Sequence, residues 1–220
     1  MNAVTPAMAP LSAQATHALL RGRRSVRYYR QDMPPRDVLD RILDSAAMAP
    51  SAHNRQPWRY AIVTDATLKT SLARAMGARL AEDRRQDGDA DDVIEADVAR
   101  SFKRMTEAPV IVLVALTVAD MDRYADEARR RAEYLMAVQS TAMATQNLLL
   151  AAHAEGLGTC WMCAPLFCPD PVHATLGLPA HWEPQGLLTL GYPERPGKLK
   201  PRRPQAEFVT FAQAGKPHSQ

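Results

Sequence analysis

Apolar positions recur along this chain with two different periods, which separate helices from strands. Val38, Ile42 and Ala46 recur every fourth residue, and this spacing places them on one face of a helix. Residues 109–117 are apolar almost without a break, which is typical of a strand buried on both faces. On this basis we predict helices at 12–22, 36–48, 67–86, 93–105, 130–155 and 170–176, and strands at 59–64, 109–117, 157–162 and 186–192.

The order of these elements predicts an α+β fold, a three-layer α/β/α arrangement with a mixed sheet around a buried central helix. The regular βαβ alternation and the Gly-x-Gly-x-x-Gly turn of a Rossmann domain are missing from the sequence. The central helix is the one at 130–155, because its segment 135–152 carries no charge. That segment is about as long as a bilayer span, but its polar side chains would be costly in lipid, so a core or a subunit interface fits better.

The length of 220 residues predicts one domain, 1–220, with a surface tail at its end. From Pro193 onward the chain is rich in proline, lysine and arginine and has few apolar residues to join a core. We therefore expect 193–220 to run over the surface as an extended tail that packs on a partner subunit.

The composition indicates a soluble protein: 46% of the residues are hydrophobic and 23% are charged. A net charge of +3 permits an anionic ligand but does not demand nucleic acid. Residues 1–10 lack a basic segment followed by an apolar run, so no secretory signal is predicted. An odd cluster of cysteines, Cys160, Cys163 and Cys168, does not indicate a disulfide framework, and we expect a reducing cytoplasm and no membrane partner.

Residues 23–27, Arg-Arg-Ser-Val-Arg, form a candidate anion site. Guanidinium groups match phosphate oxygens in pairs, and the small Ser25 donor lets a phosphate approach closely. A solvated basic turn at a helix end is the simpler reading, since cations also suit the helix dipole there. A second polar stretch, 49–58, favours the anion site because it gathers Ser51, Asn54 and Gln56 close together.

Three further patterns are weaker. Cys160-Trp-Met-Cys163 has the spacing of a redox pair, but residues three apart on a strand point to opposite faces, and a working dithiol normally begins a helix. A zinc site would need a fourth ligand, for which His173 is the one candidate. The basic run 21–30 contains two tyrosines and could bind single-stranded nucleic acid, but the modest net charge argues against it.

Four stretches, in this order, resemble the flavin-dependent nitroreductase family. They are Arg-Arg-Ser-Val-Arg at 23–27, Pro-Ser-Ala-His-Asn-Arg-Gln-Pro-Trp at 50–58, Gly-Leu-Gly-Thr-Cys-Trp at 156–161 and Lys-Pro-Arg-Arg-Pro at 200–204. The resemblance covers roughly 19–209. It implies a homodimer with extensive subunit contact and FMN at the interface.

The resemblance also implies a role for each matching residue. The residues that would hold the FMN phosphate are Arg23, Arg24, Ser25, Lys200, Arg202 and Arg203. The residues that would contact the flavin ring are Arg27 at the N1/O2 edge, Asn54 at the pyrimidine rim with Pro50 and Ser51 beside it, and Met162, Cys163 and Ala164 near N5. His53 neighbours Asn54 and could contact substrate.

The implied chemistry takes place at flavin N5, so no catalytic side chain is expected, only positioning and an open ring face. Arg27 would stabilise the anion at N1 of the reduced ring. The implied activity is ping-pong hydride transfer from NADH or NADPH to a small organic acceptor such as a nitroaromatic or a quinone. Cys163-Ala164 stands where the family commonly has an acidic residue followed by glycine.

Segments 156–161, 176–184 and 191–192 also resemble the C-terminal nitroreductase-like domain of the bifunctional enzyme of coenzyme F-420 biosynthesis. That likeness adds a dehydro-deazaflavin precursor to the candidate acceptors. A flavin- or deazaflavin-binding dimer without turnover is the alternative function, motivated by Cys163-Ala164.

Overall fold

The computed structural model describes residues 12–212, and its centre is a four-stranded sheet. The strands are β1 (Trp58–Val63), β2 (Val110–Leu116), β3 (Gly158–Met162) and β4 (Glu183–Gly191), in the order β1-β2-β4-β3. All three pairings are antiparallel, so the expectation of a mixed sheet was wrong. The one parallel pairing in the described chain is an isolated bridge between Ser25 and Thr159.

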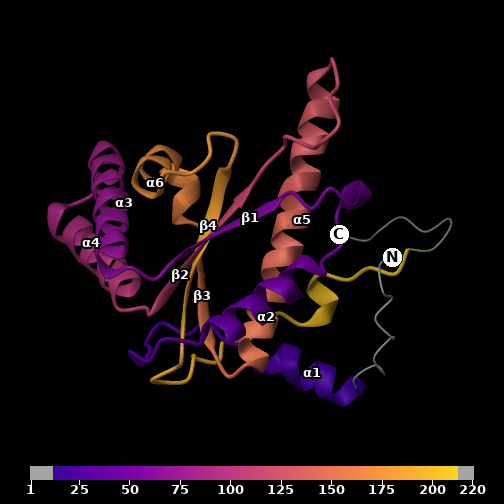
Figure 1. Ribbon diagram of the computed structural model, residues 1–220, viewed down its shortest axis with the longest axis horizontal. Coiled ribbons are helices and arrows are strands. Elements are labelled where there is room, and N and C mark those ends of the chain that lie inside the picture. The colour runs from indigo at the N-terminus through magenta and orange to yellow at the C-terminus, as the bar shows by residue number, and fades with distance from the viewer. Residues whose placement is uncertain (1–11, 213–220) are drawn as a thin grey trace.

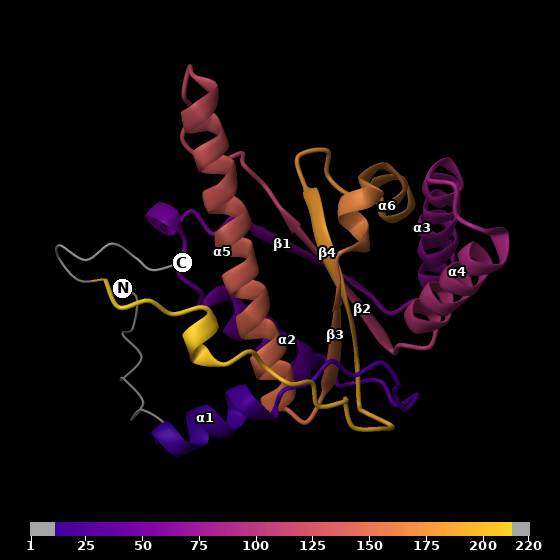
Figure 2. The ribbon, with the colours of Figure 1, turned by 180° about the vertical axis from the view of Figure 1, so that it is seen from behind.

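Helices cover both faces of the sheet, as the three-layer prediction required (Figures 1 and 2). They are α1 (Ala13–Gly22), α2 (Arg36–Ala47), α3 (Ala66–Gln86), α4 (Asp91–Thr106), α5 (Glu127–Ala154) and α6 (Pro169–Leu176). Helices α2 and α5 lie on one face, and α3 and α6 on the other, with α4 packed beside α3. Short 3-10 turns, which the sequence did not predict, lie at Ala52–Asn54 (η1), Ala164–Phe167 (η2) and Gln205–Glu207 (η3).

Strand β2 is buried on both faces, as its continuous apolar sequence predicted. Val110, Val112 and Val114 join the core under α2 and α5. Ile111 and Leu113 join the core under α3 and α6. Successive side chains of a strand point to opposite faces, so a strand between two helical layers must be apolar at every position.

Helix α5 is buried on one face within the described chain, and the expectation that a core or a subunit interface covers the rest stays a prediction. Leu148 and Ala152 are buried against the sheet, whereas Leu135 and Met143 remain 46% and 41% exposed. The first turns of α5 project beyond the sheet (Figure 1). Within residues 12–212, no helix is both long enough and apolar enough to cross a lipid bilayer.

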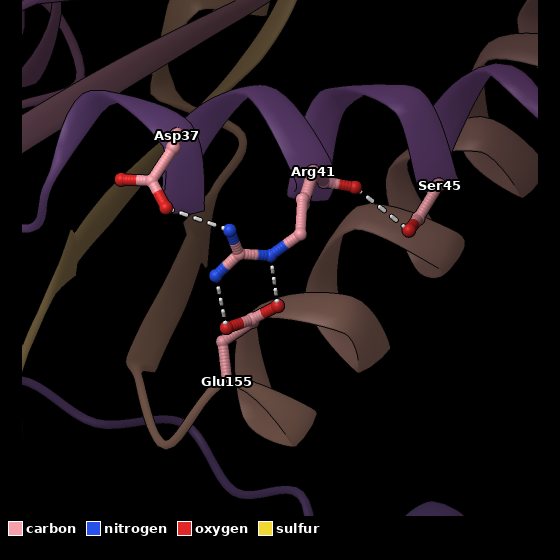
Figure 3. Close-up of polar contacts among 4 residues, drawn as sticks. All are labelled: Asp37, Arg41, Ser45 and Glu155. Carbon is pink, nitrogen blue, oxygen red and sulfur yellow. Dashed lines mark hydrogen bonds and ion pairs between the residues drawn. The ribbon is translucent and has the colours of Figure 1, made fainter.

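An ion-pair cluster ties α2 to the end of α5 (Figure 3). The Arg41 guanidinium donates from Nε and Nη2 to the two carboxylate oxygens of Glu155, each at 2.9 Å, and from Nη1 to Asp37 at 2.8 Å. Because a planar guanidinium matches a carboxylate in this two-bond geometry, the cluster fixes the orientation of α2 on α5.

Candidate active site

A groove of about 910 Å³ lies at the end of the sheet where α1 finishes. Its walls come from three stretches: 20–28, 195–202 and Arg104 on α4. The cationic side chains that line it are Arg21, Arg23, Arg24, Arg27, Arg104, Arg195, Lys198, Lys200 and Arg202. No aspartate or glutamate in the described part of the chain lines it, so the charge of the groove favours an anion.

Segment 23–27 is held in place by β3. Helix α1 ends at Gly22, and the bridge from Ser25 to Thr159 brings the next residues alongside the start of β3. The Val26 amide donates to the Thr159 carbonyl at 2.9 Å. A Cβ on Gly158 would come within 2.7 Å of Val26, so the two backbones approach this closely because position 158 is a glycine.

Tyr29 anchors the other end of this segment. Its hydroxyl lies 2.5 Å from the Val26 carbonyl oxygen and 2.8 Å from the Thr189 hydroxyl on β4. Burial raises the pKa of the Tyr29 hydroxyl well above its ordinary value. A buried hydroxyl with these partners stays protonated and fixes the backbone of 26–29 to the sheet.

The C-terminal segment completes the groove by pairing with residues 28–30. The Glu194 amide donates to the Tyr28 carbonyl at 3.0 Å, and the Arg30 amide donates to the Tyr192 carbonyl at 2.9 Å. The Arg195 guanidinium lies over the Tyr28 ring, 4.5 Å from its centroid. The two segments lie side by side in both ribbon views (Figures 1 and 2).

The cations of the groove repel one another, and all of them except Arg195, which has Glu194 at 3.6 Å, lack carboxylate partners in the described chain. The ion pairs of residues 12–212 involve none of Arg21, Arg23, Arg24, Arg27, Arg104, Lys198, Lys200 and Arg202. Burial and the neighbouring Arg202 and Arg24 lower the pKa of Arg23. Elsewhere most exposed arginines have an acidic partner, so this clustering is specific to the groove.

His153 of α5 borders the same site, which the sequence did not reveal. A Cβ on Gly22 would come within 2.7 Å of His153 Nε2. Burial, followed by the charges of Arg23 and Arg24, lowers the pKa of His153. The imidazole is therefore neutral at physiological pH and adds no further charge to the groove.

Residues 50–56 form a separate site with a strained backbone, outside the basic groove of the same chain. His53, Asn54 and Gln56 all have positive φ angles, of 49°, 54° and 50°. The Ser51 hydroxyl accepts from the Gln56 amide at 3.0 Å, and the Gln56 side chain donates to Asn54 Oδ1 at 3.3 Å. Such conformations are costly for residues other than glycine and concentrate at functional sites. Pro50, Ser51, His53 and Asn54 are thus brought together, but away from Arg23.

Met162, Cys163 and Ala164 lie where β3 ends and η2 begins. From Thr159, which is bridged to Ser25, the strand advances three residues to Met162, a distance of about 10 Å. The Trp161 indole donates to the Cys163 sulfur at 2.9 Å. Cys160 is buried and Cys163 is exposed, so the two cysteines do not face each other as a redox pair.

Lys200 and Arg202 line the groove, but Arg203 does not. Arg203 points toward Glu207, with 3.8 Å between Nε and the carboxylate oxygen. Arg104, Arg195 and Lys198 line the groove although the sequence did not single them out. The clearest available signal was the continuation of basic residues from 195 to 203.

Comparison with known proteins identifies the class of protein that this fold and groove represent. The Nitroreductase family model matches residues 20–192, and the chain belongs to that family. It is 31% identical over 213 residues to an NADH dehydrogenase of Thermus thermophilus, covering 86% of this chain and 92% of that protein.

Solved structures agree with this membership. Iodotyrosine deiodinase bound to FMN and 3-iodo-L-tyrosine superposes with a TM-score of 0.69 at 25% identity, covering 90% of this chain and 98% of that one. The FMN-dependent nitroreductase NfnB of Mycobacterium smegmatis, in complex with NADPH, has the same fold, with a TM-score of 0.70 at 24% identity and coverages of 91% and 99%. The expectation of a nitroreductase-family oxidoreductase is confirmed, and FMN is the cofactor in both of these relatives.

Proposed function

We propose that this protein is an FMN-dependent NAD(P)H oxidoreductase whose basic groove holds the FMN phosphate. The observation that carries this proposal is the convergence of Arg23, Arg24, Lys200 and Arg202, from opposite ends of the chain, on one site without carboxylate partners. A phosphate monoester supplies the missing negative charge and several acceptor oxygens. The residues present therefore fit the group.

The rest of the flavin would extend along β3. The step of about 10 Å from Thr159 to Met162 suits a ligand that has its phosphate at Ser25 and its ring near Met162, Cys163 and Ala164. When bound, FMN supplies a ring nitrogen, N5, that takes a hydride from a nicotinamide and passes electrons to a second substrate in ping-pong order. The protein positions this ring and places Arg27 as a cation toward its N1/O2 edge.

We further propose that the active unit is a homodimer, with the 50–56 loop of one chain completing the groove of the other. The protomer exposes large apolar side chains, among them Met48 (77%), Phe167 (71%) and Leu199 (76%). Burial of these side chains against a second copy would support association, because an interface removes apolar surface from water. The tail at 193–212 supports this arrangement because Phe208 and Phe211 are also exposed, while 213–220 lies outside the described residues.

The first experiment is the visible absorption spectrum of the purified protein, followed by heat release and identification of the ligand. Flavin bands and released FMN are expected, and the bands should be lost in Arg23→Ala. A colourless protein that does not take up added FMN would contradict the proposal.

Complementation tests the dimer. Arg23→Ala and Asn54→Ala chains, each of low activity, are co-expressed with different affinity tags, and the mixed dimer is isolated. A site shared between chains predicts that the mixed dimer recovers about one of two active sites. Activity that stays at the level of the single variants would place the site within one chain.

The acceptor is proposed at the level of class. A nitroaromatic, a quinone and a dehydro-deazaflavin precursor are the candidates, and steady-state assays with each one separate them. The alternative, a flavin-binding dimer without turnover, rests on Cys163-Ala164 beside the ring. It predicts that dithionite reduces the bound flavin whereas NADH and NADPH do not.

A further inference from the structure

The basic groove holds more positive charge than FMN can balance. Of the residues at 12–212, nine cationic side chains line it, and no aspartate or glutamate does. A phosphate monoester contributes about two negative charges at neutral pH, and a reduced flavin ring contributes about one more. Nine less about three leaves about six cations, of which Arg195 has a partial partner in Glu194 at 3.6 Å. The excess indicates that a second anionic group binds here.

The excess of positive charge extends from the groove toward α4. Arg104 and Arg27 line both the groove and an adjoining cavity of about 300 Å³. Lys103, Arg100 and one carboxylate, Glu107, also line this second cavity. Glu107 pairs with Lys103 at 3.7 Å, and Asp97 pairs with Arg100, so both of these cations already have a carboxylate partner. Neither Arg104 nor Arg27 takes part in an ion pair of the described chain.

The end of helix α4 packs against the segment that follows Arg27. The Gln31 side chain donates to the Glu107 carbonyl oxygen at 3.2 Å, which ties the end of α4 to the segment that follows Arg27. A cation in the last turn suits the dipole of α4, so a solvated arginine is the simplest reading of Arg104. The dipole does not explain why a half-buried arginine lies in a groove of like charge, where repulsion opposes it.

We propose that the cavity between α4 and residues 27–28 is a subsite for an anionic group, a carboxylate or a phosphate, of the substrate that reacts at the flavin. Arg104 binds that group, Arg27 lines the same cavity on the side of the proposed flavin site, and Tyr28 forms the wall beside it. The subsite rests on the proposed function and narrows it: acidic substrates are preferred over neutral ones of the same shape. The anionic group could belong to the acceptor or to the phosphates of the nicotinamide donor.

Equilibrium binding to the oxidised holoenzyme tests this subsite without turnover. The probes are 4-nitrobenzoate and the uncharged 4-nitrobenzamide, each titrated while the flavin absorbance is recorded. The wild type should bind the carboxylate at least about tenfold more tightly than the amide, the scale of one charge-assisted hydrogen bond. Arg104→Gln should abolish this ratio, and Arg74→Gln, which removes an exposed cation of α3 outside both cavities, should keep it.

Stopped-flow reduction by NADH, NADPH and dihydronicotinamide riboside shows whether the anionic group belongs to the acceptor or to the nicotinamide donor. If the donor supplies the anion, Arg104→Gln slows the two phosphate-bearing donors at least about tenfold and spares the riboside. The subsite is supported if Arg104→Gln removes the preference for the charged compound, either between the two nitro probes or among the three nicotinamide donors. It is overturned if the protein binds FMN but neither the probe affinities nor the donor reduction rates depend on the charge of the compound. It is also overturned if the Arg104→Gln variant no longer binds FMN. A wild type that takes up no FMN overturns the proposed function together with the subsite.

Discussion

Gly197 lies directly against Ser25: a Cβ on the glycine would be 2.9 Å from the Ser25 carbonyl oxygen and would overlap the Cβ of Arg24. The C-terminal segment can therefore reach the 23–27 stretch because position 197 carries no side chain. This contact brings Lys200 and Arg202 to the same groove as Arg23.

Gly197→Ala should push the C-terminal segment away from Arg24 and weaken FMN binding. Overpacking at such a contact costs about 1–3 kcal/mol, so the dissociation constant for FMN should rise by roughly five- to a hundredfold. Fluorescence titration of the apoprotein with FMN measures it. The thermal midpoint of the apoprotein should change little, because 193–204 lies outside the main core clusters. An unchanged dissociation constant would show that the contact between Gly197 and Ser25 does not affect FMN binding in the basic groove.

Arg202 and its neighbour Arg203 form a matched pair. Arg202 lines the groove, whereas Arg203 points toward Glu207. Arg202→Ala should raise the dissociation constant for FMN at least about tenfold, and Arg203→Ala by less than about twofold. The effect of Arg202→Ala should shrink between low and high salt, since mobile ions screen the lost attraction. Equal effects of the two variants would indicate that Arg203 also contributes to FMN binding in the basic groove.

Tyr29→Phe should lower the free energy of unfolding by about 1–3 kcal/mol, because it leaves the partners of a buried hydroxyl unsatisfied. Chemical denaturation at pH 7 measures this loss. The matched control is Tyr28→Phe, which removes the hydroxyl of an exposed neighbour.

The same hydroxyl predicts a pH dependence. The pKa of Tyr29 is raised in the folded protein, chiefly by burial. Below an unfolded pKa of about 10 both states are protonated. Above pH 10 the unfolded state loses its proton first, so the free energy of unfolding falls as pH rises. This alkaline loss should be smaller in Tyr29→Phe than in the wild type, and equal losses would contradict the assignment.

Glu155→Gln should destabilise the protein in a pH-dependent way. Hydrogen bonds from Arg41 lower the pKa of Glu155, so its contribution to stability is complete above the ordinary value of about 4.3 and is lost as pH falls below it. The difference in thermal midpoint between wild type and variant should be constant above pH 5 and shrink as the pH falls below the ordinary value of about 4.3. A difference that stays the same at every acidic pH would show that the carboxylate charge is not what matters.

Much of the fold could be predicted from the pattern of apolar residues. The helices and strands fell within three residues of their predicted ends, because all except α1 bury apolar residues at the expected period. Strand β4 begins three residues early, at Glu183, where Glu-Pro-Gln does not resemble a strand but pairs with β2 across an irregularity at Val114 and Ala115. Strand direction was not predictable, since the long connections permit either sense.

The site was predicted only where its residues are adjacent in sequence. Arg23, Arg24 and Ser25 stood out as a cluster, whereas Arg104 is an ordinary basic residue in the last turn of a helix until α4 is docked against Gln31. The positive φ angle of Gln56 has no sequence signature, because glutamine is not typical of that conformation. Tertiary packing creates both features.

The pairing of residues 28–30 with 192–194 closes a loop around most of the polypeptide. A ribosome must therefore complete almost the whole chain before the basic groove exists, so on the proposed function flavin loading would follow synthesis and could not guide its early stages. A protease that cuts between Pro193 and Arg202 would leave both core clusters intact and remove one wall of the groove. If the groove holds FMN as proposed, the yellow colour of a preparation would report whether its C-terminal segment is whole, a property that the melting temperature of the core would not reveal.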